Sequence, residues 1–271
     1  MGQVAQFETL FWHQFQCAAD MLAGACLCFL LLCACAPRLA GDVPVMPGEL
    51  VKIEAGPFMM GSYYGRHANQ PPHLVILDAF EIDRYEVTEG QFRVYIAATG
   101  QVPLVWLSQP VTGDDRLPMV GVIWREASAY SQWRGMRLPT EAEWEKAARG
   151  QDGRNYPWGN QWRPDLANTE ETAAGGLRPV GSYPAGASPY GLLDMAGNAA
   201  EWVADHFDPG YYAVSPQFNP TGPAEALDHV LRGGSWAAPA EQATVFQRNA
   251  SHSVRPNLRV GFRCARSLPE G

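Results

Sequence analysis

The segment around Asn198 holds residues whose types and spacing suggest metal chemistry. Asn198 and Glu201 lie three positions apart in Gly197-Asn198-Ala199-Ala200-Glu201. In a tight turn, the amide oxygen, the carboxylate and the backbone carbonyls, including those of Gly197 and Ala199, can converge on one point. Hard oxygen ligands of this kind bind Ca²⁺. The Asn-x-x-Glu spacing is also typical of a capping box, so the sequence leaves both a calcium site and a purely structural pair open.

A second segment, from Leu231 to Cys264, indicates a shaped pocket. A Gly233-Gly234 pair precedes a hydroxyl and an indole, and almost nothing in the following run is nucleophilic, acidic or metal-binding. The pocket candidates are Ser235, Trp236, Trp202 and Arg248. Ser235 lacks a G-x-S-x-G elbow and an obvious base, so a role in a tight turn is favoured over a nucleophile. The scattered histidines show no metal-type spacing, and neither zinc nor iron is expected.

The composition predicts the scaffold that positions these residues. The chain has 271 residues, of which 46% are hydrophobic and only 18% are charged, with 27 Gly and 22 Pro. This composition favours many turns over long helices. We expect the α+β class, as a single compact, loop-rich domain with low regular secondary structure. The net charge of −8 argues against a nucleic-acid partner, because binding to the phosphate backbone needs a basic face.

Periodicity and capping signals predict the regular elements. Alternating residues from Val51 and across residues 73–87 predict strands. Thr88 and Gln91 open a helix at 89–98, and a second helix is expected at 125–134. A third helix begins at Thr140, with Glu143 as its capping partner and Gly150 as its terminator. Residues 150–212 show little periodicity, so their aromatic side chains are expected to pack loops.

The first 47 residues indicate export. Residues 1–35 contain an uncharged apolar stretch of the length of a signal-peptide core, although no Lys or Arg precedes it. Cys35 ends a lipobox-like Leu-Cys-Ala-Cys and is the predicted lipidation site, which would place the protein on a periplasmic or cell-surface membrane. A retained membrane anchor, a cytosolic protein with a misread start and a true start at Met21 remain alternatives. Residues 36–47 are expected to form a tether to a domain at 48–266.

Six motifs occur in an order that resembles the formylglycine-generating enzyme, or sulfatase-modifying factor, family. They are "GPFMMGS", "DAFEIDRYEVTEGQF", "RLPTEAEWEKAARG", "YPWGN", "YGLLDMAGNAAEWVAD" and "LRGGSWA…R…GFRCAR". The resemblance implies a C-type-lectin-like core and structural calcium, which favours the calcium interpretation of Asn198 and Glu201. It implies another calcium site at Asn168 and Thr169, where Thr172 stands in place of an expected Asp.

The resemblance also implies what the pocket does. Copper-dependent oxidases of the family carry two Cu(I)-binding cysteines at positions that correspond here to Ala238 and Ala243. An alanine methyl cannot bind copper, so copper and formylglycine formation are not expected. The favoured hypothesis is an exported, monomeric accessory protein that binds a peptide, a protein or a small molecule. The alternatives are an exported oxidoreductase-type maturation enzyme that acts on a peptide-derived substrate and a genuine sulfatase activator.

Overall fold

A three-stranded antiparallel sheet brings the two ends of the described chain together. The computed structural model describes residues 48–108 and 112–269. The sheet contains β1 (Leu50–Ile53), β4 (Phe80–Asp83) and β9 (Ala265–Ser267), with β4 in the centre. Predictions that fall on residues 1–47, including the lipidation of Cys35, lie outside the described residues.

A separate hairpin pairs β2 (Gly56–Met60) with β3 (His73–Leu77). Its alternation buries Phe58 and Met60, and Phe58 lies opposite the buried Val75 of β3. The strands predicted from Val51 onward and across residues 73–87 are therefore confirmed. Each apolar run divides into two strands, because the chain turns between Ile53 and Gly56 and again after Leu77.

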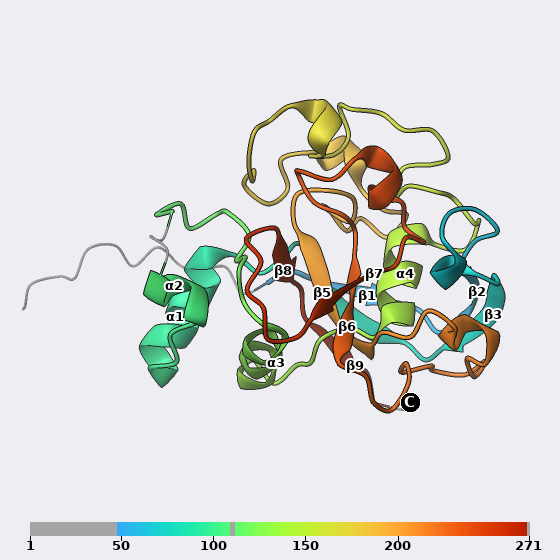
Figure 1. The fold of residues 1–271 in the computed structure, drawn as a ribbon, viewed down its shortest axis with the longest axis horizontal. Coiled ribbons are helices and arrows are strands. Elements are labelled where there is room, and N and C mark those ends of the chain that lie inside the picture. Colours follow the sequence, from blue (N-terminus) through green and yellow to red (C-terminus); the bar gives the residue numbers. More distant parts are fainter. Residues whose placement is uncertain (1–47, 109–111, 270–271) are drawn as a thin grey trace, which may run out of the picture. The chain divides into compact units, whose positions relative to one another are not determined.

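The central sheet has four strands in the order β7-β6-β5-β8. They are β5 (Ala200–His206), β6 (Asp228–Arg232), β7 (Asn249–His252) and β8 (Val260–Phe262). Strands β5, β6 and β7 pair antiparallel, whereas β8 runs parallel to β5. Figure 1 shows this sheet at the middle of the molecule, with α1 and α2 on one side and the β2-β3 hairpin on the other.

The three helices predicted from capping signals are confirmed. Helix α1 (Glu89–Thr99) has the Thr88–Gln91 capping box and ends at Gly100, whose φ is +72°. Helix α3 (Trp124–Trp133) lies within one residue of its predicted bounds. Helix α4 (Glu141–Arg149) has the Thr140–Glu143 capping box and ends at Gly150. The short helix α2 (Leu104–Ser108) was not predicted.

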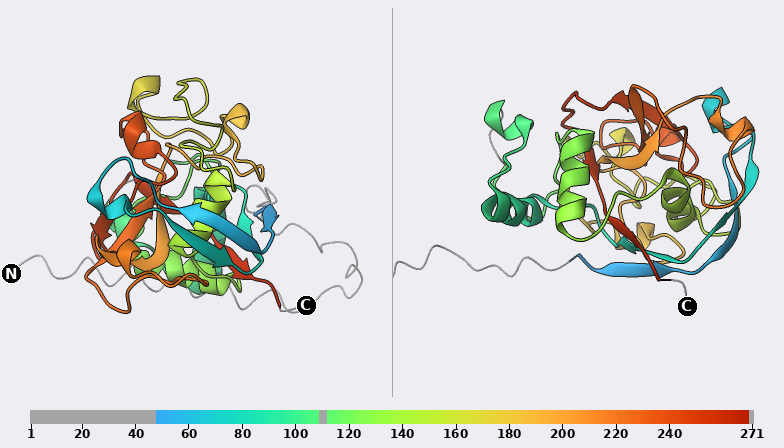
Figure 2. Two further views of the ribbon diagram at one scale, coloured as in Figure 1. Left: turned by 90° about the vertical axis from the view of Figure 1, so that its right-hand side faces the viewer. Right: turned by 90° about the horizontal axis from the view of Figure 1, so that it is seen from below.

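Helix α4 is buried along its whole length, so its charged residues need partners inside the protein. Glu141 forms ion pairs with Arg232 and Arg248. Glu145 pairs with Arg232 and also with Arg149, one turn along the helix. Figure 2 shows the helix among strands and loops in both further views. This ionic network therefore ties α4 to β6 and to the segment that follows it.

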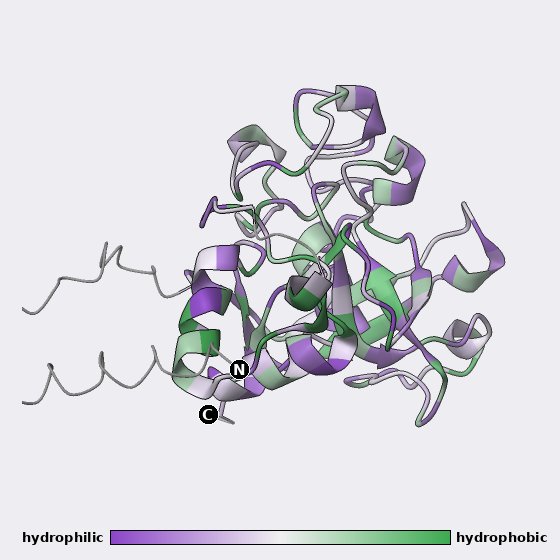
Figure 3. Ribbon diagram, turned by 60° about the vertical axis from the view of Figure 1, so that its left-hand side comes forward, coloured by the Kyte–Doolittle hydropathy of each residue, from purple (hydrophilic) through white to green (hydrophobic). Residues whose placement is uncertain are grey.

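Most of the chain between residues 150 and 199 is irregular, as predicted. It contains turns and the short 3₁₀ helices η2 (Glu170–Thr172) and η3 (Pro184–Gly186). The exception to the predicted loop packing is Trp202, which lies in strand β5 with no exposed surface. Figure 3 shows hydrophobic segments gathered on central elements and much of the hydrophilic colour on peripheral loops.

None of the helices in residues 48–108 and 112–269 has the length and apolar character that crossing a bilayer needs.

Three further 3₁₀ helices complete the described elements. They are η1 (His67–Asn69), η4 (Tyr211–Ala213) and η5 (Ala240–Ala243).

Candidate functional site

The Gly233-Gly234 pair shapes the segment that the sequence marked as a pocket. Both glycines have a positive φ, at +87° and +71°. A Cβ on Gly234 would lie 2.9 Å from the carbonyl oxygen of Gln242, closer than real Cβ contacts allow without a shift. The chain therefore needs glycine here for its backbone conformation and for the close approach of a neighbouring loop.

The two alanines at the positions of the family's copper cysteines lie in that loop. Ala243 has no exposed surface and packs with Ala167 and Ala196, against which Trp158 and Trp162 pack in turn. Ala238 is half-buried, and its N–H donates to the carbonyl of Ser235. Neither methyl group supplies a metal ligand or a nucleophile.

The only cysteine among the described residues is Cys264, which does not approach this chemistry. It is completely buried, and its Sγ lies 3.2 Å from the hydroxyl of Ser131. Burial raises the pKa of the thiol well above its usual range. Cys264 is therefore a protonated core side chain, and it does not replace the missing thiolates.

The four sequence-predicted pocket residues divide into two groups. Ser235 and Trp236 lie at the start of the loop, and the backbone carbonyl of Ser235 accepts a hydrogen bond from the N–H of Ala238. A role for the Ser235 hydroxyl, in a turn or as a nucleophile, stays a prediction. Trp202 and Arg248 require a correction, because both are buried in the interior. The indole of Trp202 donates to the carbonyl of Val122, and Arg248 is held by Glu141.

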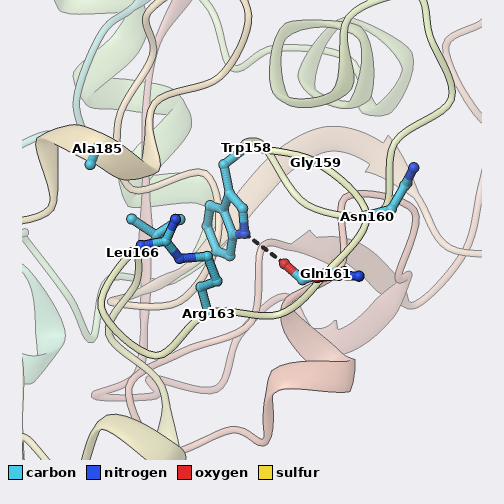
Figure 4. A pocket seen from close by; sticks show the side chains of 7 residues that line it. All are labelled: Trp158, Gly159, Asn160, Gln161, Arg163, Leu166 and Ala185. Atoms are coloured by element: carbon cyan, nitrogen blue, oxygen red, sulfur yellow. Dashed lines mark hydrogen bonds between the residues drawn. The ribbon is translucent and has the colours of Figure 1, made fainter.

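A hollow of about 430 Å³ lies beside the Ala243 cluster. Figure 4 shows the indole of Trp158 next to Arg163 and Leu166, while the side chain of Asn160 points away from them. The Trp158 indole nitrogen donates to the carbonyl of Gln161. The residues that line the hollow are Trp158, Gly159, Asn160, Gln161, Arg163, Leu166 and Ala185. Sequence reasoning missed this hollow, because its lining comes from turns without a periodic pattern.

The two predicted calcium segments do come together. Gly197 and Asn168 form a parallel bridge, and the N–H of Asn198 donates to the carbonyl of Asn168. The Asn168 amide also donates to Oδ1 of Asn198 at 3.1 Å. Asn198 has a φ of +58°, so it sits in a tight left-handed turn directly before β5 and caps no helix.

The side-chain oxygens of Asn198 and Glu201 already accept hydrogen bonds from N–H groups of the protein. Oδ1 of Asn198 accepts from Asn168 and from the backbone of Arg178. The carboxylate of Glu201 accepts two bonds of 2.7 Å from Arg263 and one of 2.8 Å from the indole of Trp144. Asn198 and Glu201 therefore do not present a shared cradle for Ca²⁺ in this arrangement.

In the second predicted calcium site, at Asn168 and Thr169, one of the two oxygens already accepts a hydrogen bond. Oδ1 of Asn168 is buried and has no hydrogen-bond partner among the described residues. The carbonyl of Thr169, however, accepts a 2.5 Å bond from the hydroxyl of Thr172. Thr172, which stands in place of the expected Asp, thus occupies the oxygen that the resemblance assigns to the metal. Asn168 alone keeps an available oxygen, so this set does not fit Ca²⁺ either.

Two buried acids that sequence reasoning missed lie beside Glu201. Glu86 accepts from the Asn198 amide and from the N–H of Ala199, and Asp194 accepts from the N–H of Gly181. Burial raises the pKa of Asp194 to about 6, and burial together with the neighbouring carboxylates of Asp194 and Glu201 raises that of Glu86. Three acids thus lie near one guanidinium, that of Arg263, and burial disfavours the ionised form of Glu86 and Asp194. No pattern of spacing in the sequence indicates that Glu86 and Asp194 are buried.

The fold and this loop define a class of protein, and comparisons identify the family. Residues 37–268 match the sulfatase-modifying factor enzyme 1-like domain. The formylglycine-generating enzyme of Streptomyces coelicolor is 34% identical over 279 residues, which cover 79% of this chain and 88% of that protein. The structure of PvdO from Pseudomonas aeruginosa superimposes with a TM-score of 0.73 at 28% identity, covering 82% of this chain and 95% of that one.

A protein named serine/threonine-protein kinase pkn1, from Chlamydia pneumoniae, is 37% identical over 242 residues. The match covers 81% of this chain but only 38% of that longer protein. The mixed helix and sheet topology is consistent with a C-type-lectin-like fold. The chain belongs to the formylglycine-generating enzyme, or sulfatase-modifying factor, family.

Proposed function

We propose that this protein is a ligand-binding member of its family that does not generate formylglycine. The observation that carries the proposal is the presence of Ala238 and Ala243 at the two positions where the resemblance implies copper-binding cysteines. Cu(I) binds preferentially to soft thiolates, and a methyl group offers neither a ligand nor a nucleophile. The retained glycine pair and packed loop support a function that needs the shape of the site without its thiols.

The hollow beside Ala243 supports the binding function. Its lining combines an indole, the apolar side chain of Leu166 and polar groups from Gln161 and Arg163. Ligand sites commonly combine apolar surface with a few placed polar groups in this way. The bound molecule is proposed to be a peptide, a protein segment or a small molecule, and the protein is proposed to act as a monomer.

Copper affinity tests the proposal. A colorimetric Cu(I) chelator should keep its copper in competition with the full chain, since no thiolate pair is available. The matched variant carries Ala238→Cys and Ala243→Cys and should withdraw copper from the same chelator. Tight, stoichiometric copper binding by the unaltered protein would refute the proposal. Copper binding by the double variant alone would support it and would show that the loop geometry is retained.

Export remains part of the proposal. It is supported by the uncharged apolar stretch and by the lipobox-like ending at Cys35. Expression of the full chain in a bacterial host should give a membrane-associated protein whose intact mass corresponds to an acylated N-terminal Cys35. A soluble product that retains Met1 would contradict this part of the proposal and leave the binding function untouched.

A further inference from the structure

We propose that Trp236, Arg178 and Arg259 form a binding site for an acidic peptide. The inference rests on the proposed ligand-binding function and adds the chemistry of the ligand, namely carboxylate side chains along an extended segment. It depends on three features. They are the convergence of three distant chain segments, a guanidinium stacked on an indole, and the lack of acidic partners for both arginines among the described residues.

The turn from Asn198 to Ala200 brings the three segments together. The backbone N–H of Arg178 donates to Oδ1 of Asn198 at 3.0 Å, and the N–H of Trp236 donates to the carbonyl of Asn198 at 2.9 Å. The N–H of Ala200 donates to the carbonyl of Arg259 at 2.9 Å. Residues from three loops thus meet around one rigid turn that directly precedes β5.

The guanidinium of Arg259 lies over the indole of Trp236, with its central carbon 5.5 Å from the ring centroid. Stacking of this kind holds a guanidinium by its face and leaves the N–H groups at its edge available for a carboxylate. The site therefore offers a guanidinium edge and an aromatic surface.

Charge pairing separates these arginines from most others in this acidic protein. Within residues 48–108 and 112–269, neither Arg178 nor Arg259 has a carboxylate within 4.0 Å. Many other surface arginines do have such a partner. These pairs are Arg84–Glu49, Arg93–Asp115, Arg116–Asp114, Arg154–Asp152, Arg163–Asp165 and Arg266–Glu81.

An external carboxylate would supply the missing partner. Arginine binds carboxylates through two parallel N–H···O bonds, which adds geometric specificity to the charge attraction. The exposed side chains of Arg178 and Arg259 extend from chain segments that meet at one turn, which suits a ligand with more than one acidic group, and the indole of Trp236 offers apolar contact. An acidic peptide meets both requirements. By contrast, Arg163 in the neighbouring hollow is already neutralised by Asp165.

The test measures binding of a fluorescein-labelled Gly-Glu-Gly-Glu-Gly-Glu peptide to the full chain by fluorescence anisotropy. A Gly-Gln repeat of the same length is the neutral probe. We expect the Glu peptide to bind about tenfold or more tightly than the Gln peptide at low ionic strength, and added salt should reduce the difference. The double variant Arg178→Gln/Arg259→Gln should lose this preference, and Trp236→Leu should weaken binding of both peptides.

Arg125→Gln is the matched control, because Arg125 is an exposed arginine of α3 that also has no carboxylate partner among the described residues. It removes the same charge and should leave the preference unchanged. Equal binding of the two peptides, absence of binding, or an equal loss in the Arg125→Gln variant would each overturn the inference. These outcomes are distinct from a failure of the proposed function, which would appear as tight copper binding by the unaltered chain.

Discussion

Gly234 lies directly against Ala243, across the loop that holds the family's catalytic positions. A Cβ at Gly234 would lie 3.1 Å from Cα of Ala243 and 2.9 Å from the Gln242 carbonyl oxygen. Position 243 is thus held by backbone contact as well as by its own packing. The site keeps a defined shape although its thiols are absent.

Gly234→Ala should therefore destabilise the protein more than a glycine-to-alanine substitution whose only effect is to strain a positive φ. We expect a free energy of unfolding that is lower by about 2–4 kcal/mol, from the strained φ and the displaced loop together. Gly175→Ala is the control, because Gly175 has almost the same φ, +72°, but nothing within 4 Å of its Cβ position. Denaturant unfolding measures both variants. Equal losses would show that the contact with Ala243 contributes nothing.

Arg263→Leu should be among the most destabilising single changes. Arg263 and Glu201 form an ion pair with no exposed side-chain surface, and the substitution leaves Glu201 next to Glu86 and Asp194 without its cation. We expect a loss of about 3–5 kcal/mol. Arg266→Leu removes an arginine that is half exposed and paired with Glu81, and should cost less than about 1 kcal/mol. Thermal melts that shift equally would contradict this distinction.

Local signals were sufficient to predict most regular elements of the first half of the domain. Helices α1 and α4 carry their start and stop signals within a few residues, so Thr88 and Thr140 mark them directly. Strand β5 was not predicted, because "AEWVADH" is buried on both sides of a central sheet and shows no simple alternation. Such a strand is specified by its neighbours β6 and β8, which are distant in sequence.

The same limit applies to the site. The sequence placed Ser235, Trp236, Ala238 and Ala243 in one loop because they are close in the chain. It could not show that Glu201 faces Arg263, or that Trp202 points into the core, since those choices depend on long-range packing. Composition indicated a loop-rich α+β domain, whereas the expectation of a C-type-lectin-like core came from the family resemblance.

The buried acids beside Glu201 make the stability of the fold depend on pH through Asp194. The pKa of Asp194 is raised to about 6 in the folded state, from 3.8. The folded state therefore binds more protons between these values, and the stability from this group is lost as pH rises through about 6. At pH 7.5 in EDTA, Asp194→Asn should raise the melting temperature by roughly 2–4 °C, because it removes a buried carboxylate whose ionisation the folded state disfavours.

The resemblance predicts structural calcium, whereas the hydrogen-bonded oxygens of Asn198, Glu201 and Thr169 predict that millimolar Ca²⁺ leaves the melting temperatures of the unaltered protein and of Asp194→Asn unchanged. A higher melting temperature of the unaltered protein in Ca²⁺ than in EDTA would contradict this expectation. Glu170→Gln, which changes an exposed acid of η2, is the control and should respond to Ca²⁺ like the unaltered protein. Differential scanning fluorimetry measures all three proteins. Melting curves that are identical in EDTA and in Ca²⁺ for the unaltered protein would exclude a stabilising calcium site.

His229 should make the protein sensitive to acid. Its ring lies between those of Trp124 and His206, with centroid distances of 4.1 and 4.2 Å, and its buried Nδ1 has no partner in the described residues. Burial, and to a lesser extent His206, lower the pKa of His229 to about 4 from 6.5. The unfolded state binds the proton first, so stability is complete above about pH 6.5 and falls as the pH drops toward 4.

His229→Leu should reduce the loss of unfolding free energy between pH 7 and pH 5 by about 1 kcal/mol, after allowance for solvent screening. His67→Leu, at an exposed position, should leave the pH profile unchanged. Urea unfolding at the two pH values gives the comparison. A pH dependence that is the same in the unaltered protein and in His229→Leu would show that another group controls the acid response.

The measurement that tests the central claim most directly is mass spectrometry of a sulfatase-type Cys-x-Pro-x-Arg peptide after aerobic incubation with the full chain and Cu(I). The Streptomyces coelicolor formylglycine-generating enzyme serves as the positive control. Because Ala238 and Ala243 offer no thiolate, we expect the peptide mass to stay unchanged with this protein. A mass loss at the peptide cysteine that matches aldehyde formation, and that requires this protein, would contradict it.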